Sequence, residues 1–199
     1  MTEEVPQEDP AEYHIRKFIE HIGIDPADDE HLEDTPRRIT EAYRDDLFDG
    51  VDKDPARHLD TTFKEFGEEE STGDPGIVLV DNIEVKSVCA HHFLPVEGVA
   101  HVGYIPRDRV VGLSKIARVV DEYARRPQVQ ERLTNQIADT MHQSLNPKAV
   151  FVCVIATHGC MSCRGVREPH SATRTTAVRG SAGRATEQKF YSLLELEGV

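Results

Sequence analysis

Apolar side chains in the first 50 residues recur with the period of a helix and lack the alternation of a strand. The apolar residues of this first segment suit a short amphipathic helix: Tyr13, Ile15, Phe18, Ile19 and Ile22. Gly23 can end this helix. A second helix is predicted near Asp34, because Asp34 or Thr35 can cap it and Pro36 suits its first turn. It ends at Gly50, and the two helices together predict a helical arm.

Further along, β-branched residues dominate the segments 77–88 and 96–105, which predict two strands joined by a short connection. Two helices follow, one over 114–124 and one whose apolar residues recur every four positions until Pro147 ends it. The last predicted elements are two strands and a closing helix, over 149–156, 171–178 and 184–196. The resulting β-β-α-α-β-β order predicts an α+β domain.

Composition divides the chain into three parts. Residues 1–10 are acidic, contain two prolines and almost nothing apolar, which predicts a disordered tail. The helical arm is predicted over 11–66, and an acidic, glycine-bearing stretch opens a catalytic domain over 67–199. A chain of 199 residues is long enough for one such domain with its own core, so we expect one kind of site.

The charge balance narrows the range of partners. Asp and Glu total 36 against 23 Lys and Arg, and a net charge of -13 argues against nucleic acid or an anionic membrane as a partner. No apolar run approaches the ~20 residues that span a bilayer. The first residues, MTEEVPQEDP, do not have the pattern of a secretory signal, so a cytoplasmic location is predicted. A polyanionic substrate would require a local cluster of Arg and Lys.

Cysteine and histidine gather after two of the predicted strands. The sequence CAHH, from Cys89 to His92, follows one strand, and THGC, which ends at Cys160, follows another. Thiolates and imidazoles are the preferred ligands of zinc, and a Cys-x-x-His pair lets both ends of one turn hold the same ion. If the two strands share a sheet, the clusters can meet and form a zinc site.

Two interpretations of this zinc site remain open on the residues alone. In a structural site, a Cys-x-x-Cys pair ending at Cys163 would join the Cys-x-x-His pair and close the ion off with four ligands. In a hydrolytic site, three ligands would leave one position for water, with His91 and His158 beside the ion as acid and base. The role of Cys163 therefore separates the two interpretations.

Three blocks of the sequence resemble the signature blocks of GTP cyclohydrolase I, and they keep its order and separations: SVCAHHFLPVEGVAHVGYIP, VVGLSKIARVVDEYARRPQVQERLTNQI and ATHGCMSCRGV. The resemblance extends from about residue 34 to about residue 196. It implies the tunnelling fold, a four-stranded antiparallel sheet backed by two helices with an N-terminal helical arm. It also implies zinc-dependent hydrolysis of GTP to 7,8-dihydroneopterin triphosphate and formate, in pterin and tetrahydrofolate biosynthesis, by a toroidal homodecamer with sites between subunits.

The resemblance implies a role for each matching residue. The zinc ligands are Cys89, His92 and Cys160, which leave a fourth position for water. The proton-transfer residues are His91 and His158. Glu131 is implied at the guanine edge, with Gln130 beside it. The residues implied around the ribose and triphosphate are Ser114, Lys115, Arg118 and Arg164, and Ser114 is also implied to be catalytic. Arg38 is implied to reach toward the phosphates bound by a neighbouring subunit.

These implied roles agree with elementary chemistry. Guanine presents two adjacent donors, and the single carboxylate of Glu131 can accept from both. Lys115 and Arg118 share a helix face, and Ser114 lies near a helix N-terminus, where phosphate is favoured. Together they form the basic cluster that an acidic protein needs in order to bind a polyanion.

Two positions depart from the family pattern. Ala90 stands where the family usually has Glu, and Glu41 stands where a Lys is frequent. Two alternatives to the cyclohydrolase remain: a related enzyme of the same fold, such as the metal-free nitrile reductase, and a structural zinc module or purine-binding sensor. The nitrile reductase does not carry the three-ligand pattern seen here.

Overall fold

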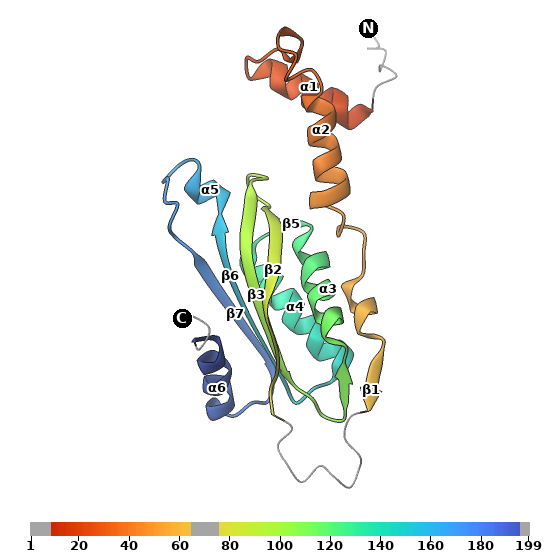
Figure 1. Cartoon of the computed structure of the whole chain (residues 1–199), viewed down its shortest axis with the longest axis vertical. Helices are drawn as coiled ribbons and strands as arrows, with labels where there is room; N and C mark the ends of the chain where they lie inside the picture. Colours follow the sequence, from red (N-terminus) through yellow and green to blue (C-terminus); the bar gives the residue numbers. More distant parts are fainter. Residues whose placement is uncertain (1–8, 65–75, 196–199) are drawn as a thin grey trace. The chain divides into compact units, whose positions relative to one another are not determined.

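The computed structural model describes residues 9–64 and 76–195 of the chain (Figure 1). The chain forms two compact units, Met1–Asp49 and Gly50–Val199. The predicted boundary between residues 66 and 67 lies outside the described residues, as do residues 1–8 of the predicted tail. Within the described ranges, no helix combines the length and the apolar character needed to cross a membrane.

The first unit is helical, as the sequence predicts. Its elements are α1 (Pro10–His21), the 3-10 turn η1 (Pro26–Asp28), α2 (Thr35–Glu41) and the π-helical turn η2 (Ala42–Leu47). Asp9 caps α1, because its carboxylate accepts a hydrogen bond from the N–H of Ala11 at 2.8 Å. Gly23 follows α1 with a φ of +92°, a conformation that glycine adopts without strain.

The second unit is built on a five-stranded sheet in the order β5-β2-β3-β6-β7. Its strands are β2 (Val78–Cys89), β3 (Pro95–Ile105), β5 (Pro127–Gln128), β6 (Ala149–His158) and β7 (Thr173–Gly180). β2, β3, β6 and β7 pair antiparallel and confirm the four predicted strands. The structure adds β5, which pairs parallel to the end of β2, and a separate pair formed by β1 (Thr62–Lys64) and β4 (Arg109–Val111).

Helices cover both faces of this sheet (Figure 1). The predicted helices α3 (Leu113–Ala124) and α4 (Gln130–Leu145) pack on one face, and α6 (Arg184–Glu195) packs on the other. The core between the sheet and α3 and α4 contains fully buried apolar side chains, among them Val102, Ile116, Ile137, Met141 and Val152. On the α6 side, the rings of Phe151 and Phe190 stack at 5.2 Å. The predicted β-β-α-α-β-β arrangement, with two helices backing the sheet, is confirmed.

A β-bulge keeps the core face of β2 continuous. The register of β2 against β3 shifts between Val80 and Ile83, and Asn82 adopts a φ of +49°. Asn tolerates this left-handed conformation better than most residues. Because one extra residue is inserted, Val80 and Ile83 both face the same core although they are three positions apart.

The short 3-10 helix η3 (Pro55–Leu59) is attached to α3 by a buried carboxylate. Glu122 is 8% exposed and lies 2.8 Å from Nε2 of His58, and Arg57 donates to the same oxygen. A buried carboxylate is tolerated when it is paired in this way. Gly50, at the start of this unit, contacts the carbonyl of Glu122 so closely that a Cβ would overlap it.

We expect His101 to make the stability of the fold sensitive to mild acid. His101 is 6% exposed and lines a hollow with Tyr191 and Leu194 of α6. Burial lowers the pKa of His101; the charge of Arg174 acts in the same direction, and Asp81 opposes it. The unfolded chain therefore binds this proton at a higher pH than the folded chain, so stability is lost as the pH falls below about 6.5.

The variant His101→Asn keeps an acceptor for the N–H of Asn82, which donates to His101 Nδ1 at 3.3 Å. We expect urea denaturation midpoints at a fixed protein concentration to fall less in this variant than in the wild type between pH 7 and pH 5. Parallel curves for the two proteins would show that other groups cause the acid sensitivity.

Candidate metal and substrate site

A tight turn at the end of β2 arranges the first half of the site. The carbonyl of Cys89 accepts from the N–H of Phe93 at 2.9 Å and of His92 at 3.3 Å, and the N–H of Cys89 donates to Leu94 at 2.9 Å. Phe93 has a φ of +55°, which is strained for a bulky residue. The turn folds His92 back toward the Cys89 side chain, so that Nδ1 of His92 lies 3.8 Å from Sγ of Cys89.

The end of β6 brings the second half of the site to the same place. Val96 of β3 pairs with His158, the last residue of β6, and the one-turn helix α5 (Gly159–Ser162) follows directly. A Cβ at Gly159 would lie 3.1 Å from the carbonyl oxygen of Pro95, so glycine permits a close approach to the β2–β3 turn. Cys160 therefore lies beside Cys89, as the shared sheet predicts.

Cys89, His92 and Cys160 form a group that could hold a metal ion, because their candidate ligand atoms all lie within 4.8 Å of one another. Ligands of a tetrahedral zinc ion stand about 2.0–2.3 Å from the metal and hence roughly 3.5–3.8 Å from each other. The donor types therefore suit zinc, and the 3.8 Å between Sγ of Cys89 and Nδ1 of His92 matches this ligand spacing. Burial raises the pKa of the Cys160 thiol, and the neighbouring Cys89 adds to the rise, first through a hydrogen bond and then through its charge.

Cys163 does not belong to this group. Its side chain is exposed, and its thiol donates to the carbonyl of Gly159 at 2.9 Å. This hydrogen bond holds Cys163 against its own helical turn.

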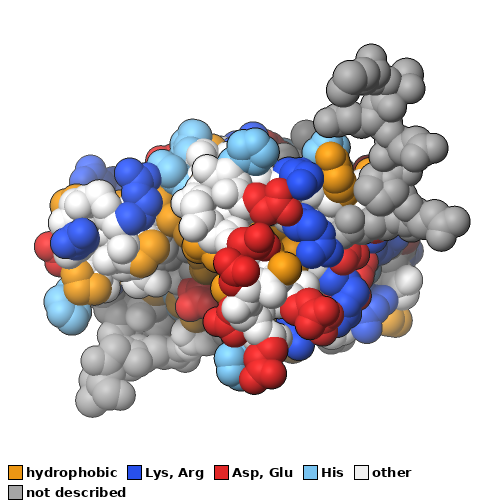
Figure 2. All heavy atoms as spheres, turned by 90° about the horizontal axis from the view of Figure 1, so that it is seen from above, with side chains coloured by type: hydrophobic (Ala, Val, Ile, Leu, Met, Phe, Trp, Pro, Cys, Tyr) orange, Lys and Arg blue, Asp and Glu red, His pale blue; other side chains and the backbone are white. Residues whose placement is uncertain are grey.

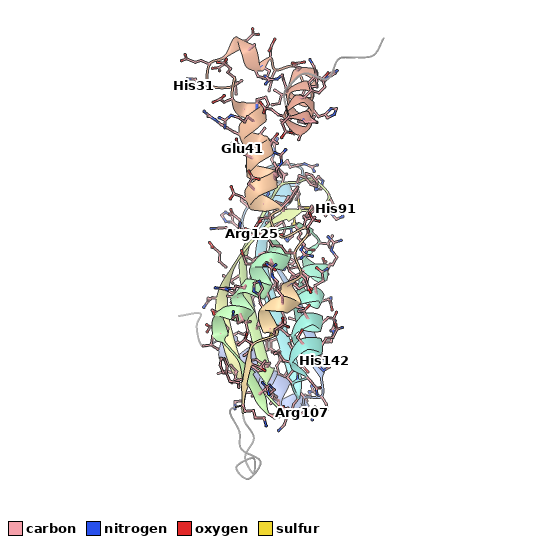
Figure 3. All side chains as sticks on the ribbon, turned by 90° about the vertical axis from the view of Figure 1, so that its right-hand side faces the viewer. His31, Glu41, His91, Arg107, Arg125 and His142 are labelled. Atoms are coloured by element: carbon pink, nitrogen blue, oxygen red, sulfur yellow. The ribbon has the colours of Figure 1, made fainter. Side chains whose placement is uncertain are left out.

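The two histidines predicted to transfer protons both lie close in the sequence to members of this group, His91 next to His92 and His158 two residues before Cys160. His91 is exposed, with Nδ1 3.9 Å from Sγ of Cys89, at the end of the sheet opposite Arg107 (Figure 3). His158 is half-buried, and its Nε2 lies 2.7 Å from Oε1 of Gln130. Burial lowers the pKa of His158, while the charge of Glu131 acts in the opposite direction.

The short strand β5, which the sequence reasoning missed, places the start of α4 beside the turn. The carbonyl of Gln128 accepts from the N–H of Ala90 at 2.9 Å, and α4 begins two residues later. Glu131 is exposed in the first turn of α4, whereas the side chain of Gln130 is only 4% exposed. Ala90 contributes a backbone N–H here, so the substitution of Ala for the family's Glu leaves this contact unchanged. A two-residue strand is too short to give a sequence pattern.

The predicted phosphate-binding residues are only partly brought to this end of the sheet. Arg164 is exposed in the segment after α5, and its charge acts on Cys160. Ser114 and Lys115 lie in the first turn of α3. The last residue of α3, Ala124, lies near the end of β2, because its carbonyl accepts a hydrogen bond from the hydroxyl of Ser87 at 2.6 Å. Ten residues of helix, or about 15 Å, separate Ser114 from Ala124. Figure 1 shows that α3 starts at the end of the sheet opposite α5.

Two further features concern charge. Arg38 is exposed on α2 in the first unit, 3.4 Å from Asp34, and Glu41 pairs with Arg37 at 2.9 Å. The phosphate role of Arg38 stays a prediction. Figure 2 shows acidic and basic side chains interspersed over the face in view, so the negative net charge is not gathered there in one area.

Comparisons with known proteins give a consistent result. The family model described as GTP cyclohydrolase I matches residues 11–195. GTP cyclohydrolase 1 of Carboxydothermus hydrogenoformans is 50% identical over 83% of this chain and 82% of its own length. The Streptomyces coelicolor enzyme is 50% identical over 92% of this chain and 89% of its own length. The Mycobacteroides abscessus enzyme is 51% identical over 85% of this chain and 80% of its own length.

A solved structure of an archaeosine synthase QueF-Like in the apo form aligns with 56% of this chain and 100% of its own, at 22% identity and a TM-score of 0.46. The three signature blocks, the family model and relatives about half identical over most of their length agree with one another. On these grounds the chain belongs to the GTP cyclohydrolase I family of hydrolases.

Proposed function

We propose that this chain hydrolyses GTP to 7,8-dihydroneopterin triphosphate and formate, using zinc held by Cys89, His92 and Cys160. The observation that carries this proposal is a three-member donor set from which Cys163 is absent. Three protein ligands are typical of catalytic zinc, whereas structural zinc is closed by four. The hydrolytic interpretation is therefore favoured over the structural one.

The protein residues around the ligands supply the rest of the chemistry. Zinc at such a site supplies a water molecule acidic enough to act as a nucleophile at neutral pH. The free carboxylate of Glu131 accepts the ring N–H and the exocyclic amine of guanine and so orients C8 of the base toward the ligand group. His158 and His91 move protons to and from the purine ring nitrogen as the ring opens.

We further propose that the site is completed between subunits of a homodecamer. Ser114 and Lys115 lie at the far end of α3 from the ligand group of their own chain. A triphosphate bound near Arg164 would meet these residues only if a neighbouring subunit presented them. The thiols of the ligand set have to stay reduced, which supports a cytoplasmic location.

A direct assay tests the reaction. Purified protein loaded with zinc under reducing conditions is mixed with GTP, and formate and the pterin chromophore are measured. Both products should appear in equal amounts. Absence of formate would favour a structural zinc module or a purine sensor, and turnover of a nitrile in place of GTP would favour the related reductase.

We expect Lys115→Ala to weaken GTP binding by about 10-fold, because one charge-assisted contact to the triphosphate is lost. The KM for GTP should rise in the variant, and in the wild type it should rise with salt, since screening weakens attraction to the polyanion. A KM that does not respond to salt would show that backbone amides dominate binding.

Mixed oligomers provide a control for the source of Lys115. If Lys115 serves a neighbour's site, co-expression of Lys115→Ala with Cys89→Ala chains should give more activity than the two variants measured separately, because some interfaces then combine two intact halves. Strict additivity would place Lys115 in the site of its own chain.

A further inference from the structure

The side chain of Gln130 is buried at the start of α4 and reaches the two strands beneath it. Its amide nitrogen lies 3.1 Å from the carbonyl oxygen of Val154 and 3.0 Å from that of Thr173. A third acceptor, Oγ1 of Thr175, lies at 3.2 Å. Because carbonyl oxygens can only accept, the NH2 group of Gln130 has to face them, and the reverse orientation would set oxygen against oxygen.

Two threonines confirm the direction of these hydrogen bonds. The hydroxyl of Thr134 donates to the carbonyl of Gln130 at 2.8 Å, so it cannot also donate to Thr175, which lies 2.6 Å away. Thr175 therefore donates to Thr134, and the oxygen of Thr175 is left as an acceptor for the amide of Gln130. The two hydrogens of the Gln130 amide are then shared among three acceptors, Val154, Thr173 and Thr175.

This orientation turns Oε1 of Gln130 toward His158. The distance from Oε1 to Nε2 of His158 is 2.7 Å, and an amide oxygen can only accept. Nε2 must therefore carry a hydrogen. In a neutral imidazole one nitrogen carries the hydrogen and the other a lone pair, so the lone pair is on Nδ1. Within residues 9–64 and 76–195, no hydrogen bond to Nδ1 of His158 is found.

We propose that Gln130 is a positioning residue that fixes neutral His158 as the Nε2–H tautomer and thereby makes Nδ1 the nitrogen that exchanges a proton with the purine. This inference rests on the proposed function, in which His158 transfers protons. The proton moves between Nδ1 and the purine ring nitrogen, and Nε2 keeps its own hydrogen throughout, because the amide cannot take it. In this proposal Gln130 acts on the reaction through His158 and does not itself contact the guanine.

The test measures the tautomer itself. We would label the histidines of the zinc-loaded protein with ¹³C and ¹⁵N and record solid-state NMR spectra at a pH where the imidazoles are neutral, assigning His158 by its loss in His158→Asn. The wild type should show the Nε2–H tautomer. In Gln130→Met, which has nearly the same shape but no amide, the Nδ1–H tautomer should appear.

Gln128→Met is the matched control. Gln128 is 5% exposed, and its amide donates to the carbonyl of Tyr123 at 2.7 Å, but its side chain makes no hydrogen bond to His158 among the described residues. We expect this variant to keep the Nε2–H tautomer, because a purely structural disturbance does not exchange the two nitrogens.

Kinetics supply the second measurement. Loss of a residue that orients a metal-ligating histidine typically costs about 10- to 100-fold in metal affinity or activity, and we apply the same range to the orientation of His158. We expect kcat of Gln130→Met to fall by this factor while KM for GTP stays nearly constant. An Nδ1–H tautomer in the wild type, or an unchanged kcat in Gln130→Met, would overturn the proposal. If the wild type shows the Nε2–H tautomer but releases no formate, the tautomer assignment stands and the proposed function fails.

Discussion

Alanine at Cys89, His92 or Cys160 is expected to remove both the metal and the formate release. The three donor atoms lie within 4.8 Å of one another, and no fourth His, Cys, Asp or Glu of the described residues joins the group. If a metal held there acidifies the attacking water, as proposed, its loss should lower turnover by on the order of 1,000-fold or more. Metal content per chain and formate release from GTP measure the two effects.

Cys163→Ala is the control for these three variants. Because the Cys163 thiol donates to Gly159 and lies outside the ligand group, this variant should keep about one zinc ion per chain and nearly normal turnover. Loss of zinc from Cys163→Ala would instead make Cys163 a fourth ligand and the site structural. Full zinc in any of the three ligand variants would contradict the ligand assignment.

Glu131→Gln is expected to lower kcat/KM for GTP by roughly 1,000-fold or more. The carboxylate of Glu131 is exposed at the start of α4, and among the described residues its side chain has no hydrogen bond or ion pair. It is therefore free to accept both donors of guanine. The amide of glutamine offers one acceptor, and its NH2 group would face the second N–H donor of guanine. A site with two donors facing each other loses orders of magnitude in kcat/KM.

Inosine triphosphate, which lacks the exocyclic amine, makes this test specific. The wild type should prefer GTP to inosine triphosphate strongly, and Glu131→Gln should lose most of that preference. Glu84→Gln, at an exposed carboxylate on β2 that pairs with Lys86, should leave the preference unchanged. Unaltered kinetics with GTP in Glu131→Gln would mean that another group reads the base.

The local pattern of the sequence determined most of the elements. Apolar periodicity predicted α1, α2 and α4, because a helix depends on residues three or four positions apart. The predicted start of α2 is correct, although the side chain of Asp34 makes no capping hydrogen bond. Runs of β-branched residues predicted β2, β3, β6 and β7 for a similar reason. The Cys-x-x-His pair at Cys89 and His92 was also readable, since one turn of the chain holds both of its members.

Tertiary structure alone decided the features that depend on distant residues. Cys160 and Cys163 are three positions apart and chemically identical. The pairing of β6 with β3 and the close approach of Gly159 to Pro95 bring Cys160 into the candidate metal group, whereas the Cys163 thiol donates to its own backbone. β5 arises from two residues that satisfy the N–H of Ala90, a contact with no local pattern.

The pairing of Gln130 with His158 and the distance of Ser114 from the ligand group likewise follow from strand register and helix length. The amide nitrogen of Gln130 is held by the carbonyls of Val154 on β6 and Thr173 on β7, 24 and 43 positions further along the chain, and its oxygen then lies beside His158. The sequence determines which donors and acceptors each side chain has. Which of them form hydrogen bonds, and in which direction, depends on the atoms that the fold brings within about 3 Å.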